Sequence, residues 1–208
     1  MKKVIEANRL SADDLNTFVR GDALALVVRG FYPDSDRVDL DSIENHDAIE
    51  EYRYVTHKDG EKHELPFGVK RLGLPFSSSF GESSDSQARQ NYYDKALPQI
   101  HQLRRLFSPL LSPIDMLRLE LDELWPQGAG VGRLESRLMF TGIVRITEAE
   151  TDILEVRPHV DSMTPDMPIE RQHAANIYLD TPSEGGELVI YPERGSLSQE
   201  QVHDIETN

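Results

Sequence analysis

The second half of the chain is a series of short apolar segments separated by turns, and this pattern constrains the fold more than any other feature. Each segment is rich in β-branched and aromatic residues, as β-strands are. The segments span residues 137–147, 153–161, 174–180 and 187–191, and Gly185-Gly186 lies in the turn before the last. Four such segments in succession predict a mainly β architecture in this half of the chain.

Two helices are expected upstream of these strands. Residues 92–107 carry apolar side chains at helical spacing, with Pro98 as an expected kink or break. Ser112 and Pro113 have the residue types of an N-cap and a first helical position, and the helix they begin should end near residues 125–126. We therefore expect residues 84–126 to form a helical support region.

The N-terminal part predicts further elements of the same domain. Ser11 is an expected N-cap, and residues 23–31 form a nearly continuous apolar run that suits a buried strand. Residues 52–56 alternate between apolar and polar side chains, and Asp59-Gly60 is a hairpin-turn dipeptide. We expect one domain over residues 1–208, since this length suffices for a single packed core.

Composition excludes several classes of function. The formal net charge of -15, from 22 Lys and Arg against 37 Asp and Glu, would repel nucleic acid and anionic membrane surfaces. The chain has no cysteine, so a metal would have to bind to His, Asp or Glu. We see neither a signal peptide nor an apolar run of the roughly 20 residues that a membrane span requires. A cytoplasmic protein with a small-molecule substrate is expected, whereas the oligomeric state is not indicated.

His159 and Asp161 are the candidate catalytic and metal-binding pair. They stand two apart at the end of a predicted strand, where side chains at i and i+2 project from the same face. An imidazole and a carboxylate so placed match part of the two-His, one-carboxylate facial triad that binds Fe(II). The same spacing occurs in His57-Lys58-Asp59, but there Gly60 follows and the residues are interpreted as a hairpin turn.

The surroundings of His159 and Asp161 favour a double-stranded β-helix, a jelly-roll or cupin-like fold with flanking helices. A strand, a loop, a second strand, a Gly-Gly turn and a third strand follow one another there, as that fold requires. From the residues alone, a structural His-Asp pair at a strand end is an equal alternative.

Two loops are candidates for the substrate entrance. Phe76 and Phe80 lie in a serine-rich loop where a solvated linker would not place aromatic rings. The alternative is that both rings hold the loop on the core. Ser162 and Met163 begin the loop that leaves the predicted metal-binding strand, and we expect them to contact substrate as well.

Residues 176–180 and 184–191 resemble the strand-turn-strand that follows the His-x-Asp pair in bacterial Fe(II)/2-oxoglutarate-dependent oxygenases. Residues 27–33 resemble the first core strand of that family. The order of elements is most similar to the carrier-independent group of alkaloid halogenases and N-succinyl amino-acid hydroxylases, whose members act on free small molecules. The resemblance implies Fe(II) and 2-oxoglutarate as cofactors, succinate and CO2 as co-products, and contacts from Asn176 and Tyr178 to 2-oxoglutarate.

Within that group the halogenases carry Gly or Ala at the carboxylate position, so Asp161 implies hydroxylation. The family also has a distal His ligand and an Arg that binds 2-oxoglutarate, and neither can be assigned here; His203 is too helical in context to take the role. We therefore expect that the C-terminal strands are missing and that the 208 residues alone are inactive. Two alternatives stay open: a non-catalytic cupin-like binding module, and a cupin-type hydrolase or isomerase that would have to use Glu170.

Overall fold

The computed structural model describes residues 3–33, 37–58, 61–79, 82–140, 142–148, 169 and 171–190. These residues group into two compact units, each built from separated stretches of chain. The first unit takes the described residues up to Val38, Leu110–Gly130 and those from Ala175 onward. The second takes Asp39–Pro109 and the described residues from Val131 to Ala174.

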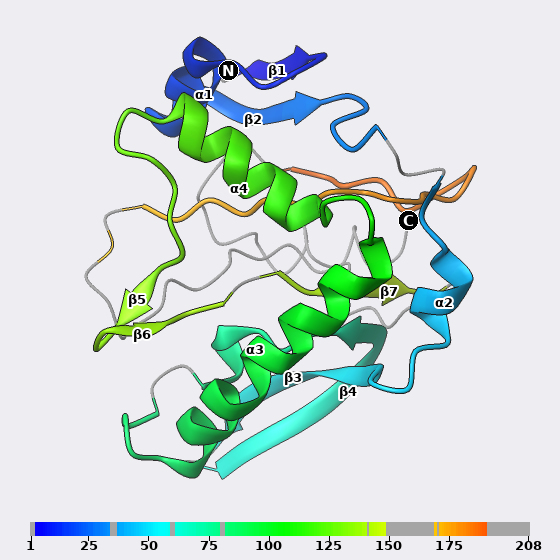
Figure 1. Ribbon diagram of the computed structural model, residues 1–208, viewed down its shortest axis with the longest axis vertical. Coiled ribbons are helices and arrows are strands. Elements are labelled where there is room, and N and C mark those ends of the chain that lie inside the picture. The colour runs from blue at the N-terminus through cyan, green and yellow to red at the C-terminus, as the bar shows by residue number, and fades with distance from the viewer. Residues whose placement is uncertain are drawn as a thin grey trace. The chain divides into compact units, whose positions relative to one another are not determined.

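The first unit contains a small strand-helix-strand arrangement (Figure 1). Strand β1 (Lys3–Ala7) pairs in parallel with β2 (Ala23–Val28), and helix α1 (Ala12–Val19) connects them. Ser11 caps α1 as predicted: its side chain accepts a hydrogen bond from the Asp14 amide at 3.1 Å. The strand predicted over residues 23–31 is confirmed as β2, but it is only partly buried, since Val27 is 41% exposed.

Helix α4 (Pro113–Leu124) belongs to the same unit. Ser112 is its N-cap and Pro113 opens it, because proline lacks the amide hydrogen that a first helical turn leaves unbonded anyway. The helix ends at Leu124 with Trp125 as C-cap, as the sequence predicted. The Tyr32 hydroxyl donates to the Leu111 carbonyl at 2.7 Å and so ties the segment before α4 to the strand region.

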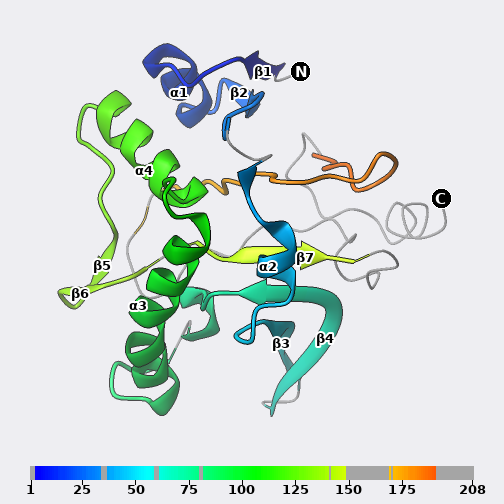
Figure 2. The same cartoon turned by 45° about the vertical axis from the view of Figure 1, so that its right-hand side comes forward.

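The second unit is a three-stranded antiparallel sheet packed against one long helix (Figures 1 and 2). Its strand order is β3 (Glu50–Lys58), β4 (Glu61–Leu72) and β7 (Val144–Thr147), so the predicted hairpin around residues 59–60 is confirmed in its two strands. Helix α3 (Gln87–Phe107) contributes Ile100 and Leu103 to a cluster around Leu72, which is fully buried. Shorter elements complete the unit: α2 (Leu40–Glu44), the 3-10 turn η2 (Phe76–Ser79), β5 (Arg133–Leu134) and β6 (Arg137–Leu138).

Helix α3 continues through Pro98, so the expected break does not occur. Proline removes one backbone hydrogen bond and its ring crowds the preceding helical turn, and Pro98 lies on the exposed side of α3. The opposite side of α3 buries Tyr92, Ala96, Ile100, Leu103 and Phe107, at spacings of three and four residues. This burial along the whole helix outweighs the loss at one position.

The strand predicted over residues 137–147 is divided in two. Gly142 adopts a φ of 98°, which is outside the extended region, and it separates β6 from β7. Gly73, at φ 103°, follows β4 at a point of close packing: a Cβ there would meet the Gly142 carbonyl oxygen and the Leu103 side chain, each at 3.3 Å. The two glycines therefore permit the close approach of β4, α3 and the chain before β7.

Residues 171–190 form neither helix nor strand, although two strands were predicted over 174–180 and 187–191. A β-strand requires backbone hydrogen bonds to a neighbouring strand, and no described residue makes such a pairing with this segment. Several of its apolar side chains are exposed, with Leu188 at 62% and Val189 at 65%. The predicted strand 153–161 lies outside the described residues, so the jelly roll stays a prediction. Among the described residues, no helix is long and apolar enough to cross a membrane.

Candidate functional site

Most of the predicted site falls outside the residues that the structure describes. This holds for the metal-binding candidates His159 and Asp161 and for the substrate candidates Phe80, Ser162 and Met163. The described residues contain no group of three or more His, Asp or Glu side chains placed to hold a metal ion. The metal site therefore stays a prediction from the sequence.

Asn176 and Tyr178, predicted to contact 2-oxoglutarate, are both described. They lie in the part of the first unit that forms neither helix nor strand, and both side chains are exposed, Tyr178 at 56%. Their contact with 2-oxoglutarate stays a prediction from the sequence.

Of the four predicted substrate residues, Phe76 is the one that the structure describes. It lies in the core of the second unit. It is 8% exposed and packs edge-on against Tyr92 of α3, with ring centroids 5.0 Å apart and planes at 81°. Tyr92 is 1% exposed and donates its hydroxyl hydrogen to the Phe140 carbonyl at 2.7 Å. This geometry favours the alternative that the ring holds the loop on the core.

A buried arginine completes this cluster. The Arg89 guanidinium carbon stands 4.8 Å from the centre of the Phe76 ring, and the residue is 2% exposed. Its Nη2 donates to the carbonyls of Ser79, at 2.8 Å, and Glu82, at 3.0 Å. The sequence offered no sign of this role, because Arg89 is one of several charged residues in a helix whose buried face only packing reveals.

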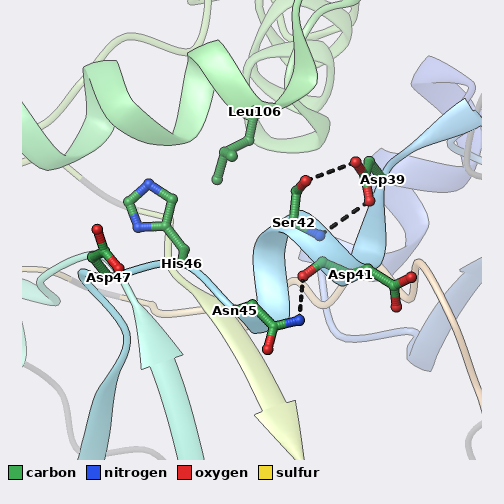
Figure 3. Close-up of a pocket in the computed structure, with 7 residues that line it drawn as sticks. All are labelled: Asp39, Asp41, Ser42, Asn45, His46, Asp47 and Leu106. Atoms are coloured by element: carbon green, nitrogen blue, oxygen red, sulfur yellow. Dashed lines mark hydrogen bonds between the residues drawn. The ribbon is translucent and has the colours of Figure 1, made fainter.

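A polar hollow lies where α2 and the following turn face α3 (Figure 3). Three carboxylates line it with Ser42, Asn45 and His46, while Leu106 of α3 covers one side; the carboxylates are Asp39, Asp41 and Asp47. Three of these side chains are bonded to the local backbone. Asp39 caps α2 through Ser42, Asn45 donates to the Asp41 carbonyl at 2.8 Å, and the His46 Nδ1 accepts from the Ala48 amide at 3.1 Å. These three bonds stabilise the start and the end of α2 and the turn after it.

The carboxyl group of Asp39 should titrate abnormally for this reason. The Ser42 hydroxyl, followed by the Ser42 amide, donates to the carboxylate and holds its pKa below the ordinary aspartate value. The Asp39 cap should therefore stabilise α2 at pH values above the ordinary aspartate pKa. This stabilisation should be lost as the pH falls through the lowered pKa of Asp39. Carboxyl carbon NMR shifts across an acid titration measure it, and Ser42→Ala should move the pKa back toward the ordinary value. An Asp39 pKa at or above the ordinary value would contradict this.

No protein-family model matches the chain, and neither a curated protein nor a solved structure shows significant similarity to it.

Proposed function

We propose that this chain is an Fe(II)- and 2-oxoglutarate-dependent oxygenase of the cytoplasm that hydroxylates a free small molecule and releases succinate and CO2. The observation that carries the proposal is His159-Val160-Asp161 at the end of an apolar segment, followed by a loop and by two apolar segments around Gly185-Gly186. The proposed fold is the jelly roll that this order of segments predicts.

The donor types suit the proposed ion. With no cysteine in the chain, metal ligands must be nitrogen or oxygen donors, and one imidazole with one carboxylate is the adjacent part of the facial set that Fe(II) oxygenases use. When bound, the iron supplies open positions for a bidentate 2-oxo acid and for O2. The role of His159 and Asp161 is to hold the ion on one face and, through the carboxylate, to neutralise part of its charge.

The proposed roles of the other site residues rest partly on the structure and partly on the sequence alone. Asn176 and Tyr178 are proposed to contact 2-oxoglutarate, and their exposed side chains leave them accessible. Ser162, Met163 and Phe80 stay proposed substrate contacts on sequence grounds. Phe76 is better explained as a core residue, given its burial against Tyr92. The third ligand has no assigned residue, and His173, exposed in the described segment, is the first histidine to test for it.

The test is an Fe(II) titration of the purified chain, together with the formation of succinate from 2-oxoglutarate, with Fe(II) and ascorbate, by a form of the protein that adds the expected C-terminal strands. Turnover in that form that requires both iron and 2-oxoglutarate would support the proposal. Binding of Fe(II) and 2-oxoglutarate without succinate in that form would favour the alternative of a non-catalytic cupin-like binding module. Failure to bind Fe(II) would overturn the metal assignment for this chain.

A further inference from the structure

A buried side chain, Arg89, bonds to the backbone of the segment between β4 and α3. Arg89 lies in the first turn of α3, whose N-cap is Ser86, and its guanidinium reaches back over the segment that precedes the helix. One nitrogen, Nη2, donates to two carbonyls, those of Ser79 and Glu82. These two residues stand immediately before and after Phe80-Gly81.

The same segment is tied internally and to the core. The Glu82 amide donates to the Ser79 carbonyl at 3.3 Å, and the Ser79 hydroxyl donates to the Phe76 carbonyl at 3.0 Å. Ser79 is fully buried, and Phe76 lies between the guanidinium and the Tyr92 ring. The contacts of Arg89 thus join the carbonyls of Ser79 and Glu82 to α3.

The chemistry of this position requires arginine. A buried cation is costly unless its hydrogens are bonded, and a planar guanidinium can bond carbonyls at its edge while its face lies on an aromatic ring. A lysine ammonium keeps the charge but has neither the flat face nor the fixed fork of donors.

We propose that Arg89 is a conformational clamp, which holds Phe76–Ser79 and Glu82 so that these residues leave their positions only when the guanidinium leaves its buried position. The clamp does not depend on the proposed oxygenase activity, because it follows from the contacts of Arg89 alone.

Limited proteolysis of the full chain tests the clamp. Chymotrypsin cleaves after aromatic residues, so cleavage at Phe76-Ser77 and Phe80-Gly81, followed by mass spectrometry, reports opening of the segment. Arg89→Lys should increase the rate at these two bonds by about tenfold or more, since hydrogen bonds from a charged donor and the ring contact are lost together. Urea unfolding of the same proteins gives the global stability.

A matched control is Arg137→Lys. The Arg137 guanidinium also lies on a tyrosine ring, 3.5 Å from the centre of Tyr93, and donates to Gln90 at 3.2 Å, but the residue is exposed. Cleavage at the two phenylalanine bonds should change by less than about twofold in this variant, because an exposed contact of this kind contributes little. An equal increase in both variants would overturn the clamp.

Two further outcomes decide against the proposal. If Arg89→Lys raises cleavage only in proportion to its loss of global stability, the opening is global unfolding and there is no local clamp. If that variant does not fold, hydrogen exchange in the unaltered protein decides. The Glu82 amide should exchange far more slowly than an unstructured amide, and exchange at the unprotected rate would overturn the proposal.

Discussion

The variants His159→Ala and Asp161→Ala are each expected to bind Fe(II) more than about 100-fold more weakly. They should also lose 2-oxoglutarate turnover in a form of the protein that adds the expected C-terminal strands. Removing a residue that only supports a metal ligand lowers metal affinity by about 10–100-fold, and removing a direct ligand should lower it more. The measurements are an Fe(II) titration and succinate release under the same conditions. Unchanged Fe(II) affinity in both variants would refute the assignment of the pair.

The chain provides its own matched control for this experiment. His57 and Asp59 have the same spacing, but His57 lies in β3, and Asp59-Gly60 is the predicted turn dipeptide between β3 and β4. His57→Ala and Asp59→Ala should leave Fe(II) affinity and turnover unchanged. If the hairpin variants weakened Fe(II) binding as much as the other pair, His-x-Asp spacing would have selected the wrong segment.

Asp161→Gly separates the role of the carboxylate from that of the histidine. It removes the anionic ligand and opens a position on the ion that a halide can take. Hydroxylation of substrate should therefore stop, whereas His159 still contributes its imidazole. Hydroxylation at the original rate would show that Asp161 is not a ligand.

The second large effect is expected at Phe76. Phe76→Ala should reduce the free energy of unfolding by about 3–5 kcal/mol, the range for removing a buried aromatic ring and leaving a cavity. The ring is in contact with Tyr92 and Arg89, so its loss removes a packing partner from each. Urea unfolding followed by circular dichroism is the suitable measurement, because the single tryptophan, Trp125, lies in the other unit.

Two controls make the Phe76 result specific. Leu97→Ala removes an apolar side chain from α3 that is 38% exposed, and it should cost less than about 1 kcal/mol. Phe76→Leu keeps most of the volume and should cost less than the alanine variant. A loss below about 1 kcal/mol for Phe76→Ala, with a raised KM for substrate, would instead support the substrate role.

Elements with local signals were predictable from the sequence. Ser112 and Pro113 specify the start of α4 because capping uses hydrogen bonds within three residues, and Ser11 does the same for α1. The β3–β4 hairpin was predictable for the same reason, since its turn dipeptide and its alternation lie within one short stretch. None of these elements needs a distant part of the chain to be recognised.

Elements that depend on distant partners were not predictable in the same way. The apolar pattern of residues 174–180 and 187–190 is that of strands, yet they are unpaired in the described structure, because a strand exists only through the ladder that another segment offers. Pro98 was expected to interrupt a helix, but burial of the opposite face of α3 maintained it.

For the candidate site, the sequence by itself determined the donor types and their spacing: an imidazole and a carboxylate two residues apart, and no thiolate anywhere. Only the tertiary structure decided that Phe76 faces the core and that Arg89 is buried over its ring. The physical reason is that metal-ligand chemistry is a property of the side chains and their local geometry. The burial of a ring or a cation, in contrast, depends on which surfaces from distant parts of the chain are packed around it.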